Sequence, residues 1–194
     1  PLYSSAASDV YKRQAKCVNV EGEIVDCNIE EVDIEKNVDT LPIYIRMDND
    51  KVQGIALPIA GKGLWSTIYG YIALNPDTDS VLGIQFYKHG ETPGLGGEVE
   101  KKWFTDNFVN HPIEQPGGEI QYVPKRIRDE SGKIISIKVV KGGVDYSKSN
   151  NASIHQVDGI SGATVTADGV TDFLLEDLLR YEKTLDKIRD YGTI

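Results

Sequence analysis

Residues 41–57 read LPIYIRMDNDKVQGIAL, and this stretch indicates the fold. Two runs of alternating apolar residues flank the polar turn DND at 48–50, a pattern typical of two antiparallel strands joined by a tight turn. Two further apolar runs follow at 64–74 and 81–87, separated by a turn sequence that contains proline. The sequence therefore predicts a hairpin that continues into a meander of strands.

Downstream of this meander the pattern changes. Residues 90–97 are too rich in glycine for a helix or a strand, whereas residues 98–108 carry apolar side chains at helical spacing, so we expect a loop and then a short helix. Residues 134–140 are rich in β-branched side chains and predict a strand. We expect residues 112–124 to form a loop and residues 145–156 to be a polar connection.

The C-terminal part of the chain predicts a helix from about Thr166 to Ile188. Its apolar residues fall on one helical stripe, formed by Val170, Leu174, Leu178, Leu185 and Ile188 and widened by Phe173, Leu175 and Leu179. Strands grouped before helices, without regular alternation, predict an α+β fold with a mainly antiparallel twisted sheet and packed helices. We expect one main domain over residues 41–190.

The first 40 residues differ in character. Residues 1–14, PLYSSAASDVYKRQ, resemble translated read-through of a sequencing adapter, so we expect an assembly artefact or disorder and leave them out of the fold prediction. Residues 15–40 are acidic with isolated apolar positions, which predicts a loosely structured peripheral segment. Cys17 and Cys27 fit neither a zinc site nor a C-x-x-C motif; two free thiols are the simplest interpretation and a disulfide is the main alternative.

The charge of the chain limits its partners. Lys and Arg number 21 against 30 Asp and Glu, which gives a formal net charge of −9. General attraction to nucleic acid or anionic lipid is therefore not expected, and any bound phosphate must be held by a local feature. No stretch approaches the ~20 apolar residues of a membrane helix, so we expect the chain as written to be soluble.

The segment DGISGATVT, residues 158–166, lies immediately before the predicted C-terminal helix. The unpaired amides at the start of a helix favour an anion, so a phosphate would be stabilised there despite the negative net charge. The simplest alternative is that Ser161, Thr164 or Thr166 caps the helix. Capping and attachment of a ligand are compatible with each other.

The sequence SGAT within DGISGAT is similar to the attachment motif of flavoproteins that are modified by an FAD-dependent flavin transferase. The resemblance implies that Thr164, the last residue of the motif, carries FMN through a phosphoester, with Ser161, Gly162 and Ala163 beside the cofactor. A threonine hydroxyl is a weak nucleophile, and no residue next to Thr164 supplies a base. We therefore expect a separate transferase to move FMN from FAD.

A second segment, HGETPGLGGE at residues 89–98, resembles the ETPGLG loop of the same flavin-binding domain. Glycines permit close approach of the backbone, and hydroxyl and carboxyl groups can hydrogen bond to flavin hydroxyls or beside the phosphate. The alternative is an ordinary loop containing glycine and proline. The resemblance implies flavin contacts by Glu91, Thr92, Gly94, Leu95 and Gly96.

Two shorter segments support the same resemblance. GKGLWS at residues 61–66 resembles a stretch of the C subunit of the sodium-translocating NADH:quinone oxidoreductase, which implies that Trp65 lines the isoalloxazine; a buried core tryptophan is the alternative. VVKGG at residues 139–143 resembles the KG element that precedes the attachment loop. Lys141 is expected to pair with the phosphate or a flavin carbonyl, unless it is a solvated lysine at a strand end.

The segments stand in the expected order, and the resemblance covers residues 41–190. The chain is thereby identified as a member of the C-subunit family of FMN-binding domains. This implies a flavoprotein with covalent FMN that transfers electrons in an oxidoreductase and translocase, from NADH toward ubiquinone, coupled to sodium transport. The implied partners are the other subunits, and no residue here is expected to be catalytic, to bind a metal, or to bind NADH, quinone or sodium by itself.

The resemblance also implies a place in the cell. In that family the domain lies on the periplasmic side of the bacterial inner membrane, behind one N-terminal transmembrane helix that the present sequence does not contain. Membrane anchorage is therefore an expectation from the family alone.

Two alternative functions remain open at this point. One is a G-type flavoprotein subunit of the Rnf complex, which acts with ferredoxin and NAD, although the GKGLW stretch argues against it. The other is a non-redox module whose glycine loops bind a different phosphorylated ligand or an assembly partner. A zinc deaminase is excluded because the H-x-E of His89 to Glu91 has no accompanying P-C-x-x-C.

Overall fold

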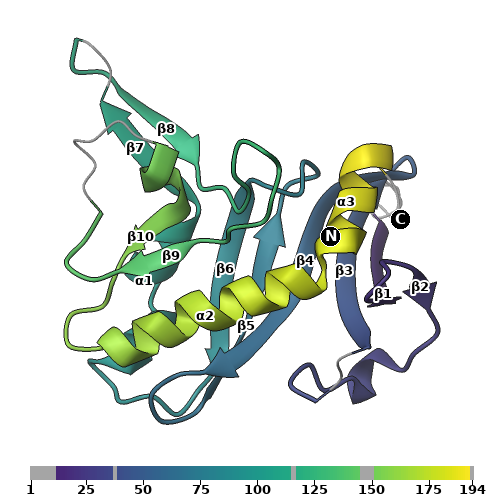
Figure 1. Ribbon diagram of the computed structural model, residues 1–194, viewed down its shortest axis with the longest axis horizontal. Helices are drawn as coiled ribbons and strands as arrows, with labels where there is room; N and C mark the ends of the chain where they lie inside the picture. Colours follow the sequence, from purple (N-terminus) through teal and green to yellow (C-terminus); the bar gives the residue numbers. More distant parts are fainter. Residues whose placement is uncertain (1–11, 37–38, 115–116, 145–150, 193–194) are drawn as a thin grey trace, which may run out of the picture.

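The computed structural model of the chain describes residues 12–36, 39–114, 117–144 and 151–192. Its centre is a six-stranded antiparallel sheet with the strand order β2-β1-β3-β4-β5-β6 (Figure 1). The α+β class with a mainly antiparallel sheet is thereby confirmed. The strands of the sheet are β1 (Lys12–Asn19), β2 (Ile24–Val25), β3 (Thr40–Asp48), β4 (Lys51–Lys62), β5 (Thr67–Leu74) and β6 (Val81–Lys88).

The predicted hairpin and meander are both present. β3 and β4 are joined by Asn49 and Asp50 alone, whose φ angles of 46° and 62° are left-handed. A two-residue hairpin turn requires this conformation, which Asn and Asp tolerate better than most residues. β4 extends to Lys62, so the GKG sequence lies partly in the strand and does not interrupt it.

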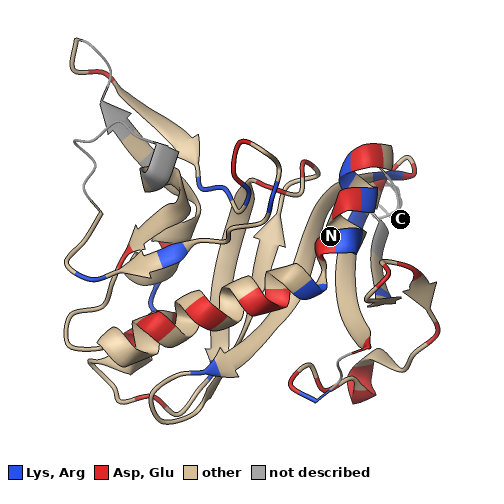
Figure 2. Cartoon of the chain, in the orientation of Figure 1, with Lys and Arg blue, Asp and Glu red and all other residues tan. Residues whose placement is uncertain are grey.

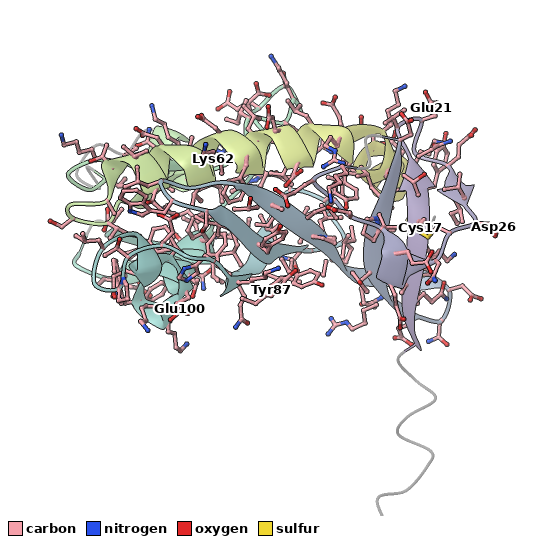
Figure 3. All side chains as sticks on the ribbon, turned by 90° about the horizontal axis from the view of Figure 1, so that it is seen from below. Cys17, Glu21, Asp26, Lys62, Tyr87 and Glu100 are labelled. Carbon is pink, nitrogen blue, oxygen red and sulfur yellow. A yellow bond between two sulfur atoms is a disulfide. The ribbon has the colours of Figure 1, made fainter. Side chains whose placement is uncertain are left out.

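The core lies between the sheet and helix α2 (Thr164–Arg180), which crosses one face of the sheet (Figure 1). Burial of each large apolar side chain stabilises a fold by about 1.5–3 kcal/mol. The buried apolar side chains of α2 therefore hold this helix against the sheet. The opposite face of the sheet carries stacked tyrosines, among them Tyr87, which points away from α2 in Figure 3. Buried residues of this layer include Leu57, Ile59, Ile72, Val170, Phe173 and Leu174.

The N-terminal segment is part of the sheet, contrary to the prediction for residues 15–40. β1 pairs with β3 from Lys12↔Met47 to Asn19↔Thr40, so residues 12–14 also belong to the strand. The prediction of free thiols is wrong as well, because Cys17 and Cys27 form a disulfide across a Cα–Cα distance of 6.1 Å (Figure 3). The segment is ordered by contacts distant in sequence, which its weak alternation does not reveal.

Two predictions in the middle of the chain are corrected. The expected loop at 112–124 contains a hairpin, β7 (Asn110–Glu114) with β8 (Ile120–Pro124). The strand expected at 134–140 is limited to β9 (Lys138–Val140), because Ser136 has a left-handed φ of 65° that interrupts an extended chain. β9 pairs in parallel with β10 (Gln156–Asp158) beside the main sheet.

Both helices predicted from the sequence are divided into shorter segments in the structure. The single helix expected at 166–188 is two helices, α2 and α3 (Glu182–Tyr191), separated by Tyr181. The helix expected at 98–108 consists of short pieces. The remaining helical segments are η2 (Ile29–Glu31), η3 (Gly96–Glu100), α1 (Lys102–Thr105), η4 (Asp106–Phe108) and η5 (Asn151–His155).

The polar connection predicted for residues 145–156 falls partly outside the described residues. Its described end consists of η5 and the first residue of β10. Together β9 and β10 place the segments around residues 140 and 158 side by side, at the N-terminal end of α2 (Figure 1).

Candidate functional site

A cleft of 440 Å³ opens where the N-terminal end of α2 meets the ends of β9 and β10. It brings together two segments that are distant in sequence, 139–143 and 158–168. Of the residues predicted for the flavin site, four line this cleft: Lys141, Ser161, Gly162 and Thr164. The other lining residues are Val139, Gly142, Gly143, Asp158, Gly159, Ile160, Ala167 and Asp168.

Thr164 is the first residue of α2, and its side chain is exposed at the cleft. Ala163 occupies the N-cap position, and no side-chain hydrogen bond caps the helix. The interpretation of Ser161, Thr164 or Thr166 as a simple cap is therefore wrong. The first amides of α2 are left without a capping side chain at the positive end of the helix dipole, which favours an anion in the cleft.

Thr166, two residues further on, has the opposite environment. Only 1% of its surface is exposed, and its hydroxyl donates a hydrogen bond of 2.7 Å to Oε2 of Glu91. The two threonines of the motif thus differ in access: the hydroxyl of Thr164 lies in an open cleft, whereas that of Thr166 is enclosed and engaged.

Glu91 is buried and connects the 64–66 loop to α2 through hydrogen bonds. Its carboxylate accepts the backbone amides of Leu64, Trp65 and Ser66 at 3.2, 2.9 and 3.1 Å, in addition to the Thr166 hydroxyl. Burial acts to raise the pKa of Glu91, but these hydrogen bonds outweigh it and hold the pKa below its usual value. The carboxylate of Glu91 is thus already engaged by these four protein donors, and its predicted flavin contact stays a prediction.

Two glycines give this carboxylate its space. A Cβ at Gly63 would lie 2.7 Å from Oε1 of Glu91, and a Cβ at Gly96 would lie 2.6 Å from both Oε2 of Glu91 and Oγ1 of Thr166. Gly96 was predicted to approach the flavin. In the structure its lack of a side chain lets Glu91 and Thr166 meet, and its approach to the flavin stays a prediction.

The 92–97 loop forms a tight turn next to the DGISGAT segment. The carbonyl of Thr92 accepts the amides of Leu95 and Gly97 at 3.1 and 2.9 Å, and Gly94 adopts a left-handed φ of 75°. A Cβ at Gly162 would lie 3.0 Å from the Leu95 side chain, so the loop touches the segment that carries Thr164. The side chain of Leu95 is 43% exposed and therefore open to a ligand.

Trp65 lies on the surface with 70% of its area exposed, so the alternative of a core tryptophan is wrong. The Glu91 carboxylate fixes its backbone, and the same carboxylate holds Thr166 at the start of α2. Trp65 and Leu95 thus present apolar surface from loops that contact the N-terminal part of α2 or the segment before it.

The charges around the cleft are mixed. Lys141 is the cation among its lining residues, whereas Asp158 and Asp168 contribute carboxylates. Asp168 continues into an acidic stripe along the exposed face of α2, formed with Asp172 and Glu176 (Figure 2). The expectation that no base adjoins Thr164 is thus incomplete, because two acids share its cleft.

The structure shows neither a metal cluster nor a transmembrane helix in the described residues. Within the described residues, no group of three or more His, Cys, Asp and Glu side chains is arranged to hold a metal ion. In the same part of the chain, no helix combines the length and hydrophobicity of a transmembrane span.

Comparison with known proteins agrees with this geometry. Residues 63–176, which contain the 64–66 loop, the Glu91 loop, the cleft and most of α2, match the FMN-binding domain family. The chain belongs to the FMN-binding domain family. The match includes all the residues that the sequence predicted for the flavin site.

Members of this family with high similarity are C subunits of one enzyme. The C subunit of the Na(+)-translocating NADH-quinone reductase of Vibrio vulnificus is 39% identical over 166 residues, which cover 84% of this chain and 57% of the relative. That of Pseudomonas aeruginosa is 39% identical over 133 residues, covering 68% of this chain and 44% of the relative. The chain thus spans about half the length of these relatives.

Solved structures of the family have the same fold. The crystal structure of the C subunit from Parabacteroides distasonis aligns with a TM-score of 0.71 and 30% identity, covering 93% of this chain and 81% of that one. The Shewanella oneidensis NqrC structure aligns with a TM-score of 0.69 and 26% identity, covering 92% and 84%. The resemblance to the C subunit that the sequence predicts is confirmed.

Proposed function

We propose that this FMN-binding domain carries its flavin as a phosphoester on Thr164. One observation carries the proposal: Thr164 is the exposed first residue of α2 in a cleft, whereas Thr166 is buried and bound to Glu91. The uncapped start of α2 stabilises a phosphate at this position. Leu95 and Trp65 would supply exposed apolar contacts for the attached flavin.

Each remaining predicted residue has a role in this arrangement. Lys141 and the amides of the first turn of α2 offset the phosphate charge, and Ser161, Gly162 and Ala163 shape the loop beneath it. Leu95 and Trp65 supply apolar contact for the ring system, and the turn through Thr92, Gly94 and Gly96 holds Leu95 in place. FMN supplies one- and two-electron chemistry when bound, while the protein fixes its position and surroundings.

A separate flavin transferase is the proposed source of the cofactor. The threonine hydroxyl is a weak nucleophile without strong activation, and both acids in the cleft would repel an incoming diphosphate. Exposure of Thr164 gives a second protein access to the hydroxyl. In this reaction the hydroxyl oxygen attacks the FMN phosphorus of FAD, AMP leaves, and the hydroxyl proton is transferred to a base.

The proposed activity is electron relay within a Na(+)-translocating NADH:quinone oxidoreductase. The support is the similarity to C subunits of that enzyme, which extends over 84% of this chain in the Vibrio vulnificus relative. The flavin would pass electrons from NADH oxidation toward quinone, and the other subunits of the complex would be the partners. The Rnf-type alternative has no observation in its favour here.

The proposed location is the periplasmic side of the bacterial inner membrane, with anchorage through an N-terminal helix as in the family. The disulfide between Cys17 and Cys27 supports this placement. Disulfides persist in oxidising compartments such as the bacterial periplasm and are rare in the cytosol.

The attachment is tested by co-expression of the chain with a flavin transferase, followed by intact mass measurement and in-gel fluorescence under denaturing conditions. We expect the mass to rise by one FMN moiety and the band to fluoresce. Thr164→Ala should remove both signals, whereas Thr166→Ala should keep them. A fluorescent Thr164→Ala band, or a colourless unmodified wild-type protein, would contradict the proposal.

A further inference from the structure

Asp158 is an unexpected side chain for a cleft that holds a phosphate. It is the last residue of β10, it is half-buried, and it lines the cleft together with Thr164 and Lys141. A carboxylate close to a phosphate is repulsive, so its presence requires a compensating role. Its contacts in the structure indicate what that role is.

The Asp158 carboxylate fixes the turn that follows β9. Its Oδ1 accepts the backbone amide of Val144 at 2.7 Å, across fourteen residues of chain. A hydrogen bond from a backbone amide to a carboxylate is charge-assisted and is stronger than one between neutral groups. Asp158 thereby ties the far end of the 141–144 turn to the strand that leads into the attachment segment.

The backbone conformation of the 141–144 turn depends on the hydrogen bond between Val144 and Asp158. Gly142 and Gly143 have left-handed φ angles of 81° and 91°, which non-glycine residues rarely adopt. A Cβ at Gly143 would lie 3.3 Å from Oδ1 of Asp158, so the turn passes close over the carboxylate. Ordering two successive glycines costs conformational entropy. The hydrogen bond that holds the Val144 amide restricts the conformations open to them.

The near end of the turn is held at the same place. The amide of Gly159 donates to the carbonyl of Val140 at 2.9 Å, and β9 pairs with β10 in the register Val140↔Asp158. Lys141 therefore lies between two residues whose backbone is held, Val140 and Val144. Their partners are Gly159 and Asp158, which begin the DGISGAT segment.

We infer that Asp158 is a positioning residue that anchors the 141–144 turn and so holds Lys141 at the cleft that receives the flavin phosphate. The inference rests on the proposed function, because it concerns the same cleft. It assigns the carboxylate of DGISGAT to the architecture of the site and not to the transfer chemistry. Asp158 acts through Lys141 and does not itself contact the phosphate.

The test measures the initial rate of flavin incorporation into purified unmodified chain, supplied with FAD and a flavin transferase. Asp158→Ala removes the acceptor and should lower the rate about tenfold, the effect of losing about 1.4 kcal/mol of a charge-assisted contact. Asp158→Asn keeps an oxygen that accepts the Val144 amide and removes a negative charge. It should therefore be clearly faster than Asp158→Ala, because it keeps the hydrogen bond to Val144, whereas loss of the charge alone would make the two variants equal.

Lys141→Ala supplies the second half of the test. If Asp158 acts through Lys141, the double variant Asp158→Ala/Lys141→Ala should be no slower than Lys141→Ala alone. Hydrogen exchange at Val144 gives an independent readout: the amide should exchange slowly in wild type and in Asp158→Asn, and fast in Asp158→Ala. Should Asp158→Ala not fold, Asp158→Glu replaces it, since the added methylene displaces the acceptor while the charge is kept.

The outcomes separate the two proposals. Lack of flavin on the wild-type chain, or flavin on Thr164→Ala, overturns the proposed function itself. With normal incorporation in wild type and none in Thr164→Ala, the inference about Asp158 is overturned by a wild-type rate in Asp158→Ala. It is also overturned by additive losses in the double variant, or by an Asp158→Asn variant as slow as Asp158→Ala.

Discussion

Thr164 and Thr166 share a chemical group but differ in what surrounds it. Thr164 begins α2 with its hydroxyl open to the cleft, whereas Thr166 is 1% exposed and donates to Glu91. A reagent or enzyme therefore reaches the first hydroxyl and not the second. The proposed choice of Thr164 as the acceptor rests on this difference in access.

This difference predicts that the two alanine variants have opposite effects. Thr166→Ala removes the shorter of the two hydrogen bonds to Oε2 of Glu91 and should lower the free energy of unfolding by about 1–3 kcal/mol, while flavin incorporation persists. Thr164→Ala should lose the flavin with little change in stability of the unmodified chain. Urea unfolding with in-gel fluorescence measures both properties. Thr166→Ser, which keeps the hydroxyl, serves as control, and equal stability of the two alanine variants would refute the assignment.

Lys125 provides a prediction that depends on pH. It is fully buried and donates to the carbonyls of Ser153 and Gln156 at 2.8 and 2.5 Å. Burial lowers the pKa of Lys125 from 10.5 to about 8, against the opposing attraction of Asp158. Between pH 8 and pH 10.5 the Lys125 amine is protonated in the unfolded chain and neutral in the folded one. The free energy of unfolding therefore rises with pH over this range.

Relative to Lys125→Met, the free energy of unfolding of wild type should therefore rise by up to about 3 kcal/mol between pH 8 and pH 10.5. One pKa unit corresponds to about 1.4 kcal/mol. Urea unfolding of both proteins at the two pH values gives this difference and cancels the groups they share. Parallel pH dependences would show that Lys125 titrates normally.

At the scale of elements, local patterns predicted what local forces determine. The alternation in residues 41–57 and the DND turn were sufficient for the β3–β4 hairpin, because strand period and turn chemistry are properties of a few neighbouring residues. β1 could not be predicted in this way, since it is ordered by pairing with β3 and by a disulfide.

The candidate site shows the same division. DGISGAT and the KGG turn were found from the sequence, and the structure places both at one cleft. The role of Glu91 could not be found, because its partner Thr166 is 75 residues away and its other donors are backbone amides. Gly63 and Gly96 make room for the Glu91 side chain, a role that the glycine pattern alone does not reveal.

The break between α2 and α3 shows why a continuous apolar stripe does not guarantee a continuous helix. Tyr181 is 1% exposed, and its hydroxyl donates to the carbonyl of Pro42 in β3 at 2.7 Å. A buried contact to the sheet thus fixes the residue between the helices. The stripe predicted from the sequence continues across it, because Leu178 and Leu185 both remain buried.

Tyr181→Phe should lower the free energy of unfolding by about 1–2 kcal/mol, because the Pro42 carbonyl loses its donor in the core. The helix signal in circular dichroism should stay unchanged, since packing of the ring is retained. Tyr191→Phe is the matched control, because Tyr191 is 76% exposed and should tolerate the change. A loss of stability equal in both variants would argue against the hydrogen bond as the cause.

At the scale of the whole molecule, the disulfide links the first strand to the segment that packs on the last helix. Its loop contacts α3, where the Lys187 ammonium donates to the carbonyl of Gly22 at 3.0 Å and a Cβ at Gly22 would lie 2.7 Å from the Thr184 nitrogen. The N-terminal segment is therefore an integral part of the domain and covers α3.

Replacement of both cysteines by serine should lower the free energy of unfolding by about 3 kcal/mol, the loop-closure value for a crosslink between residues ten apart. Reductant should lower the stability of wild type by a similar amount and leave the double variant unaffected. Flavin incorporation should remain in both proteins under native conditions, because the cleft lies at the other end of α2. An effect of reductant on the double variant would show a cause other than the disulfide.

The central claim, a flavin phosphate on Thr164, is tested most directly by fragment-ion mass spectrometry of the tryptic peptide Ser149–Arg180 from flavinylated protein. We expect fragments that contain Thr164 to carry the FMN mass, and those that begin at Val165 or later to lack it. An FMN mass on fragments that contain Thr166 but lack Thr164 would contradict it.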